Sequence, residues 1–395
     1  MFLRLAHMAL SYQTAGESHG PGLVATINGL PAGTPVDAAF INAELARRQG
    51  GYGRGGRQNI ETDTIEILTG VRRGLAMGSP ITLLVRNRDS RLDDLVKTPP
   101  VHRPRPGHAD LAGSIKFLTN DCREILERAS ARETTARVAA GALARCLLRE
   151  LGIEAFGLVR SIGPAATSVA VTESNWRSLI ATRDASETYC PDAAATAEQI
   201  RIIHEAKLAK DTIGGIVEAH IFGCPPGLGS CMDWRDKLDA RLAYAVMGIQ
   251  AIKGVEIGIG MAAAALPGSQ VHDPIHYDAS LRATHPNLGF TRPRNNAGGT
   301  EGGMTNGQPV VVRAAMKPIA TLGQGMPSVD LRTRENQGSQ YERSDICAVS
   351  AASVVVENVA AFEVARVVRD KFAGDSISEV RRQWEGYLEA ARAIG

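Results

Sequence analysis

The chain has 395 residues, 44% of them hydrophobic, and a formal net charge of only +2 at pH 7. It is long enough for one large domain or for two lobes around a sizeable core. The small net charge gives no reason to expect a nucleic acid or a membrane surface as partner. Lysine accounts for only 8 of the 44 basic residues. Most positive charge is therefore carried by arginine, which holds carboxylates and phosphates through two parallel hydrogen bonds.

The six cysteines have neither C-x-x-C spacing nor a nearby pair of histidines for zinc. They indicate reduced thiols, no metal site and a cytoplasmic protein. The first ten residues lack the apolar core and cleavage site of a signal peptide. No apolar run reaches the roughly 20 residues that span a membrane.

The first half of the chain is expected to mix strands, helices and glycine-rich breaks. The Asn-Gly turn, the capping Asp37 and the paired Gly50 and Gly51 mark element ends. The expected elements, in order, are a strand over 23–27, a helix from Asp37 to Gln49, strands over 60–69 and 81–86, and a proline-rich exposed loop over 89–106.

The segment Glu127–Arg137 is the most informative part of the chain. Ser130 and Glu133 have the spacing of a capping box, and an Ala-rich run follows, so a buried helix is expected to begin one residue after Ser130. Arg132 lies in its first turn and Arg128 just upstream, although positive charge there opposes the helix dipole. Free amides, a serine and two arginines indicate an anion site, but a well-capped helix with solvated arginines explains them about equally well.

Elements alternate irregularly in the second half as well, and both types occur in each half. This pattern favours an α+β fold or a layered α/β sandwich over a doubly wound parallel sheet. The expected elements are a strand over 153–159, helices over 173–182 and 195–210, a strand over 213–222, a helix near 233–247, a strand over 255–259, a loop over 284–308, a strand over 309–315, a long apolar helix over 346–372 and an amphipathic C-terminal helix.

Several arginines lie at breaks between elements, where glycine permits close backbone approach to a ligand. Each alone is more often a solvated surface residue, but their repetition indicates a polyanionic substrate. They are Arg48, Arg54, Arg57, Arg103, Arg105, Arg128, Arg132 and Arg343.

Two histidines, His19 and His108, lie in irregular segments flanked by glycine. A histidine near a phosphate can donate a proton to the leaving oxygen, because its unperturbed pKa is about 6.5. A hydrogen-bonded structural histidine is the alternative for each. His204 and His220, on an expected helix and strand, are interpreted as structural.

Two other function classes rest on single features. Gly16 to Gly20 fits the G-x-S-x-G pattern of a serine hydrolase. In such an enzyme the serine lies on a sharp turn, the nucleophile elbow, which needs a strand before it and a helix after it. Only Tyr12 to Ala15 precede it, and strand-like residues follow. An RNA-binding module would rest on the arginine content alone. The sequence also contains neither a Walker loop nor a dinucleotide-binding pattern.

Taken together, these segments closely resemble the chorismate synthase family over about residues 12–384. Three blocks resemble family signatures in the family's order, and three shorter blocks also match. The three signature blocks are Gly16–Pro31, Glu127–Ala142 and Arg343–Val359. The three shorter blocks are 47–55, Arg105–Asp110 and Gly298–Gly303.

The resemblance implies a lyase that removes phosphate and one C6 hydrogen from 5-enolpyruvylshikimate 3-phosphate by trans-1,4-elimination, giving chorismate for aromatic amino acid biosynthesis. Family members need reduced FMN although there is no net redox change, and NADPH would act only indirectly as a reductant. The chain has no large insertion of the self-reducing type, so a separate flavin reductase is expected. The family fold is a β-α-β sandwich with helices between two antiparallel sheets, usually assembled as a homotetramer.

The resemblance also assigns roles to residues. His19 would protonate the departing phosphate, His108 would act near flavin N1, and Asp345 would work with flavin N5, with Ser18 and Ser130 as relay groups. The substrate would be held by Arg48, Arg54, Arg105, Arg132 and Arg343. The flavin contacts would be Arg128, Ala129, Ser130, Gln250, Ala251, Gly302, Lys317, Pro318, Ile319, Ala320, Thr321 and Arg343.

The chain departs from the family pattern at a few positions. Ile319 and Ala320 replace hydroxyl-bearing residues, so one or two flavin phosphate contacts would come from the backbone. Gln250 stands where some members have Asn or Pro, and a longer N-terminus is consistent with a start at Met8. We expect one domain over residues 1–395 with a pseudo-two-lobed core and loops at about 47–57, 87–108, 284–308 and 320–345 around the site.

Overall fold

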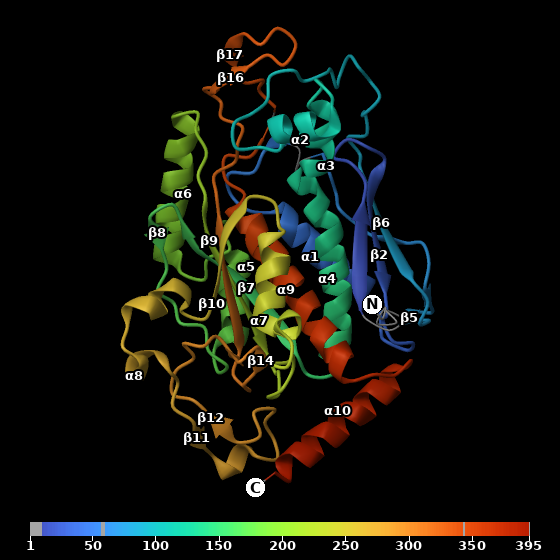
Figure 1. The fold of residues 1–395 in the computed structure, drawn as a ribbon, viewed down its shortest axis with the longest axis vertical. Coiled ribbons are helices and arrows are strands. Elements are labelled where there is room, and N and C mark those ends of the chain that lie inside the picture. Colours follow the sequence, from blue (N-terminus) through green and yellow to red (C-terminus); the bar gives the residue numbers. More distant parts are fainter. Residues whose placement is uncertain (1–9, 57–59, 343, 395) are drawn as a thin grey trace.

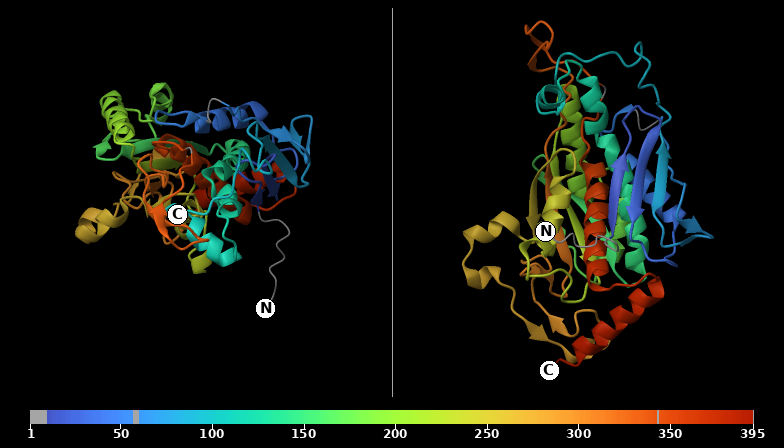
Figure 2. Two further views of the ribbon diagram at one scale, coloured as in Figure 1. Left: turned by 90° about the horizontal axis from the view of Figure 1, so that it is seen from above. Right: turned by 45° about the vertical axis from the view of Figure 1, so that its right-hand side comes forward.

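The computed structural model describes residues 10–56, 60–342 and 344–394. Its core has four layers, in the order sheet, helix, helix, sheet (Figures 1 and 2). This arrangement confirms the mixed α+β fold with helices between two antiparallel sheets. No helix in the described part combines the length and the apolar character needed to cross a membrane.

Each outer layer is an antiparallel sheet. The four-stranded sheet has the order β1-β2-β6-β3 and the five-stranded sheet the order β10-β15-β9-β7-β8. Their strands are β1 (Ser11–Ala15), β2 (Gly22–Asn28), β3 (Glu66–Ile67), β6 (Ile81–Arg86), β7 (Glu154–Ile162), β8 (Ala165–Ala166), β9 (Gly215–Phe222), β10 (Ile252–Ile257) and β15 (Val310–Met316).

Two long helices fill the space between the sheets. The helix α4 (Thr134–Arg149) packs on β2 and β6, and α9 (Val349–Lys371) packs on β7 and β9. Of the 23 residues of α9, 20 are buried, because the helix meets protein on every side and has no polar face. The two helices cross closely at Gly141, where an added Cβ would lie 2.3 Å from the carbonyl oxygen of Asn358.

The remaining elements flank this core. The helix α1 (Ala38–Gln49) packs on α4 and α9, and α7 (Leu238–Met247) packs on α9 and β10. The others are α2 (Asp110–Phe117), α3 (Arg123–Ala129), α5 (Trp176–Ala185), α6 (Ala193–Leu208), α8 (Gly268–Val271), α10 (Ile377–Arg392), β4 (Val71–Arg72), β5 (Leu75–Ala76), β11 (His276–Tyr277), β12 (Phe290–Thr291), β13 (Thr300–Glu301), β14 (Met304–Thr305), β16 (Pro327–Val329) and β17 (Asn336–Gly338).

The strand expected over 60–69 is wrong except at Glu66–Ile67. Its first residues are held by a side chain instead of a neighbouring strand. The Gln49 amide donates to the carbonyl oxygen of Glu61 at 3.0 Å and accepts the backbone N–H of Asp63 at 3.0 Å. In this segment the buried side chains are the carboxylates of Glu61 and Asp63, which are not part of a sheet.

The capping box expected at Ser130 and Glu133 is also wrong, although the helix begins where predicted, with a 3-10 turn over Ala131–Glu133. The Ser130 side chain accepts from the backbone N–H of Arg132. Glu133 does not return to the cap, because it accepts hydrogen bonds from Thr14 and Gln250 in other segments. Long-range partners thus replace the local one.

Candidate active site

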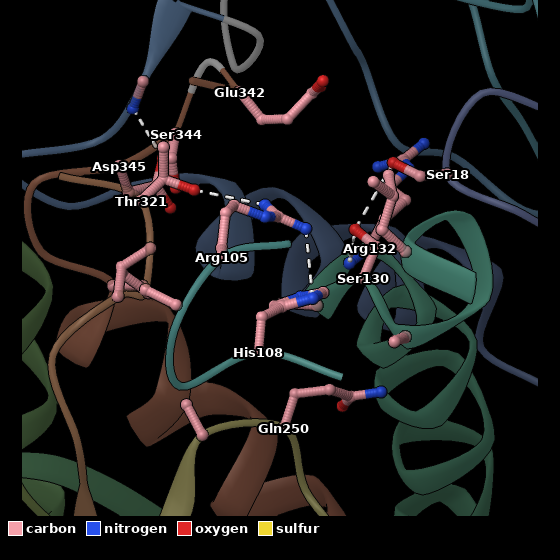
Figure 3. A pocket seen from close by; sticks show the side chains of 18 of the residues that line it. Ser18, Arg105, His108, Ser130, Arg132, Gln250, Thr321, Glu342, Ser344 and Asp345 are labelled. Carbon is pink, nitrogen blue, oxygen red and sulfur yellow. Dashed lines mark hydrogen bonds between the residues drawn. The ribbon is translucent and has the colours of Figure 1, made fainter. Parts of the chain in front are cut away.

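A cavity of about 540 Å³ lies where α4 and α9 begin and α7 ends. This volume is within the range of roughly 300–1,000 Å³ that is usual for small-molecule sites. Its wall combines segments far apart in sequence, so the site exists only in the folded chain. In Figure 3, Ser18, Ser130 and Arg132 lie on one side and Asp345 on the other, with His108 between them.

Most of the predicted site residues meet in this cavity. Those that line it are Ser18, His19, Arg48, Arg54, Arg105, His108, Ala129, Ser130, Arg132, Gln250, Ala251, Lys317, Ile319, Ala320, Thr321 and Asp345. The two serines are neighbours, since the Ser130 hydroxyl donates to Ser18 Oγ at 3.4 Å. Three of the four loops predicted around the site contribute to its wall.

The other predicted residues lie elsewhere. Arg128 lies outside the lining set and donates to the carbonyl oxygens of Thr14 and Gly16 at 2.9 and 3.0 Å, and Pro318 is likewise outside that set. Arg57 and Arg343 fall outside the described residues.

Gly302 lies far from the cavity within this chain. The carbonyl oxygen of its neighbour Gly303 accepts the backbone N–H of Leu238, at the first turn of α7, whereas the cavity lies past the last turn of that helix. No described residue of the loop over 284–308 lines the cavity. A contact between Gly302 and a cofactor therefore stays a prediction that this chain alone does not fulfil.

His19 is held from several sides. Its Nδ1 lies 3.0 and 3.1 Å from the two carboxylate oxygens of Glu127, which also accepts its backbone N–H at 2.8 Å. The carbonyl oxygen of His19 accepts the N–H groups of Arg91 and Leu92 at 2.9 and 3.0 Å. Nε2 lies 3.8 Å from Asp89 Oδ2, which is too long for a hydrogen bond.

His108 has a carboxylate partner of the same kind. Its Nδ1 contacts Asp110 Oδ1, and the same carboxylate receives Arg105 Nε at 2.8 Å and Nη2 at 3.1 Å. Asp110 is fully buried. Burial opposes ionisation, but the hydrogen bonds from His108 and Arg105 outweigh it and hold the pKa of Asp110 well below its usual range. Arg105 Nη2 also lies 3.0 Å from His108 Nδ1 (Figure 3), so Asp110 and Arg105 together fix the His108 ring.

Asn87 joins the His19 turn to the arginine side of the cavity. Its side-chain N–H₂ group donates to the carbonyl oxygens of Glu17, Ser18 and Gly20 at 3.1, 3.1 and 2.8 Å. Its Oδ1 accepts from Arg132 Nε at 2.9 Å. Because carbonyls only accept and a guanidinium only donates, a single orientation of the amide satisfies all four partners.

The charges of Arg132 and Arg48 are largely balanced within the protein. Arg132 Nη1 lies 2.7 Å from both oxygens of Asp63, and its Nη2 lies 3.6 Å from Glu61. Arg48 donates to Thr134 Oγ1 and lies 3.7 Å from Asp63. Burial, with repulsion from Arg132, lowers the pKa of Arg48. These two arginines therefore offer fixed hydrogen-bond donors more than net charge.

Asp345 is anchored on the opposite wall. It accepts the backbone N–H of Gly55 at 2.6 Å, and its second oxygen lies 3.2 Å from Arg54 Nε. Its carboxylate thus has a fixed position facing the cavity.

Lys317 differs from the arginines that line the cavity. Each of those arginines lies within 4 Å of a carboxylate, whereas Lys317 has no such partner in the described part of the chain. Burial and repulsion from Lys253 lower its pKa. Nearby, Gln250 donates its Nε2 to Glu133 at 3.0 Å, and among the residues that the structure describes its buried Oε1 has no hydrogen-bond partner. An unpaired cation and an unpaired acceptor indicate that this end of the cavity takes a polar, anionic ligand.

Sequence reasoning missed the residues that hold the site together: Glu61, Asp63, Asn87, Asp110 and Glu127. Two of them lie within the blocks that carried the resemblance, next to a predicted site residue, and proximity to His108 could have identified Asp110. The others are brought in from distant segments. Across residues 10–56, 60–342 and 344–394, no three His, Cys, Asp or Glu side chains converge as a metal site would require.

Comparison with known proteins gives a consistent result. The sequence profile described as "Chorismate synthase" matches residues 10–368. The chorismate synthases of Pelobacter propionicus and Desulforamulus reducens are 52% and 51% identical, over 98% and 96% of this chain and 100% and 99% of theirs. A solved structure titled "Crystal Structure of Chorismate Synthase" superposes with a TM-score of 0.79 at 40% identity, covering 98% of this chain and 99% of that one. On its sequence and its fold, the chain belongs to the chorismate synthase family.

Proposed function

We propose that this chain converts 5-enolpyruvylshikimate 3-phosphate into chorismate and phosphate by trans-1,4-elimination in the cavity described above. The supporting observation is that two histidines, each with Nδ1 on a buried carboxylate, share one cavity with Asp345 and five arginines. The substrate carries a phosphate and two carboxylates, which suit such a wall. Enclosure of these donors strengthens them relative to water.

His19 acts on the departing phosphate. As the C3–O bond breaks, the phosphate oxygen gains charge, and a proton from His19 Nε2 neutralises it. Arg48 and Arg132 hold that group through fixed N–H donors. Ser18 and Ser130, 3.4 Å apart, lie beside this position and can relay protons.

Asp345 acts at the other side of the ring. The C6–H bond must break on the face opposite to the leaving phosphate, and Asp345 faces His108 and Ser130 across the cavity (Figure 3). Its contacts with Gly55 and Arg54 fix the carboxylate that holds the proton lost from C6.

The family requires reduced flavin, and the residues present fit such a group. Lys317 supplies a partly buried positive charge without a carboxylate partner, which suits the phosphate of FMN, and Gln250 Oε1 is a buried acceptor that awaits a donor. Ala129, Ala251, Ile319, Ala320 and Thr321 line the same region. When bound, reduced FMN supplies electron density transiently to the reacting allylic system. His108, fixed by Asp110 and Arg105, is positioned to exchange a proton at Nε2 in this region.

The remaining assignments are also proposals. The chain acts as one domain, in a homotetramer, and receives reduced FMN from a separate reductase, so that NADPH contributes only indirectly. The expectation of a separate reductase rests on the resemblance to family members that are supplied with reduced FMN.

An anaerobic assay tests the proposed reaction. Purified protein, dithionite-reduced FMN and 5-enolpyruvylshikimate 3-phosphate are mixed, and chorismate and phosphate are measured together. Equal amounts of both are expected, whereas phosphate without chorismate would identify a phosphatase. Repeating the assay with oxidised FMN and NADPH should give no product, and turnover there would contradict the need for a separate reductase.

The proposed role of His108 has its own test. His108→Ala is expected to lower turnover about 10²–10⁴-fold, the usual range for a lost acid–base group, and to leave flavin binding intact. Turnover near that of the wild type would exclude the role.

A further inference from the structure

Glu127 contacts His19, a residue of the cavity wall, but is not itself among the residues that line the cavity. It lies on α3, its side chain is 2% exposed, and both of its carboxylate oxygens are directed at one residue, His19, which is 108 positions earlier in the chain. Its own backbone carbonyl accepts the N–H of Ser18 at 3.0 Å. One glutamate thus holds the backbone and the ring of the same histidine.

The charge on Glu127 fixes the hydrogen on that ring. Burial would raise the pKa of Glu127, but the hydrogen bonds from His19 and the charges of His19 and Arg123 outweigh it, so the pKa is lowered. A carboxylate has no hydrogen to donate. The imidazole nitrogen beside it must therefore carry the hydrogen, and Nε2 is left as the nitrogen that can give or take a proton.

The other charged groups near His19 do not compete for this nitrogen. Asp89 lies 3.8 Å from Nε2, beyond hydrogen-bond distance, and is paired with Arg91 at 3.1 Å. Arg123, 3.5 Å from Glu127, gives its shorter contacts of 2.8 and 3.2 Å to Glu342. Glu127 is therefore the group that sets the orientation of the ring.

We propose that Glu127 is a positioning residue for the elimination: it fixes the tautomer and the direction of the His19 ring so that Nε2 faces the leaving phosphate. In the step, His19 Nε2–H transfers its proton to the phosphate oxygen as the C3–O bonding pair leaves with that oxygen. The imidazolium becomes a neutral imidazole whose Nδ1–H remains on Glu127. This assignment rests on the proposed role of His19.

The variant Glu127→Gln tests the proposal, because it keeps the shape and removes the charge. The amide oxygen can accept the backbone N–H of His19, which leaves the amide N–H₂ group facing Nδ1. The ring must then accept at Nδ1 and carry its hydrogen at Nε2 when neutral, as in other active sites where an amide replaces the carboxylate behind a histidine. We expect kcat to fall about 10²–10³-fold, with KM and the affinity for reduced FMN changed less than about threefold.

Double variants distinguish a positioning role of Glu127 from a general structural role, because the effects on kcat of two residues that act through one another are not additive. In a His19→Ala background, Glu127→Gln should reduce kcat less than about twofold further. In a His108→Ala background, which serves as the matched control, it should reduce kcat by its full factor. An equal reduction in both backgrounds would overturn the proposal. Near-normal turnover of His19→Ala alone would instead overturn the role of His19.

A measurement on the wild-type chain removes any dependence on how the variant folds. Protein labelled with ¹⁵N in its histidine rings is compared with the His19→Ala variant, which identifies the His19 signals. Above the pH at which the ring deprotonates, the Nδ1 signal should be that of a protonated nitrogen and Nε2 that of a bare one. The reverse assignment would overturn the proposal.

Discussion

Removal of the Asn87 side chain tests whether the His19 turn and the arginine wall are one structural unit. In Asn87→Ala, three carbonyl oxygens lose the two hydrogens of one buried amide group, and Arg132 Nε loses its acceptor. Two neutral hydrogen bonds contribute about 1 kcal/mol each, and one to a charged group about 1.5–3 kcal/mol. The free energy of unfolding should therefore fall by about 3.5–5 kcal/mol.

Thermal unfolding measures this loss. With an unfolding entropy of about 2.1 cal/mol/K per residue, a loss near 4 kcal/mol lowers Tm by about 5 °C in a chain of this length. Asn42→Ala is the matched control, because Asn42 Oδ1 accepts one backbone N–H, that of Ile65 at 2.9 Å. Its Tm should fall by only about 1 °C.

The same variant should also affect catalysis. Asn87→Ala loosens the turn that carries His19, so kcat/KM should fall at a temperature at which the protein remains folded, whereas Asn42→Ala should retain activity. If the two variants lose the same small amount of stability, the Asn87 network contributes nothing beyond one ordinary hydrogen bond, and the reasoning is refuted.

Three further predictions concern charge and packing. Lys317→Met should weaken binding of reduced FMN about 10–100-fold, because a charge-assisted contact to the phosphate is lost, whereas binding of riboflavin should hardly change; equal losses in the two titrations would contradict a phosphate contact. Asp110→Asn should destabilise the protein at pH 7. Because the folded pKa of Asp110 is depressed, its contribution is fully present above its unfolded pKa of about 3.9 and declines steadily as pH falls from there toward the folded pKa, so the difference between the urea midpoints of variant and wild type should shrink progressively below about pH 4. A difference that does not shrink over this range would show that the charge is not its source. Gly141→Ala should lower the free energy of unfolding by about 1–3 kcal/mol, because the added methyl overpacks against Asn358. Gly386→Ala on α10, where nothing lies within 4 Å of the added methyl, should raise it by up to about 1 kcal/mol. Shifts of the denaturant midpoint in the same direction for both variants would refute the close crossing of α4 and α9.

Local signals in the sequence predicted the fold where the deciding contacts are local. Asp37 caps α1 through the backbone N–H of Phe40, and the helix ends at Gln49 as expected. The same logic failed at Ser130, because Glu133 has partners more than a hundred residues away. The capping box that does form is at Ser376 and Glu379. Spacing rules identify candidates, and tertiary contacts decide between them.

The candidate site divides in a similar way. Sixteen of the residues that line the cavity were predicted, because they lie in glycine-rich breaks and in blocks resembling a known family. Glu127, Asn87 and Asp63 were missed, because nothing in the sequence places a carboxylate or an amide beside a histidine or an arginine tens of residues away. Lys317 was found by resemblance, but its lack of a carboxylate partner could be seen only in the folded chain.

The position of α9 in the middle of the molecule has a consequence for biosynthesis. Residues 349–371 are translated only after the strands of both sheets, yet they supply the surface on which α4, α1 and the five-stranded sheet pack. Before α9 is translated, the inner apolar faces of both sheets have no shared core to pack against. Folding of this chain is therefore completed after most of it has been translated and depends on contacts of long sequence separation, which makes it slow and exposes the nascent polypeptide to aggregation.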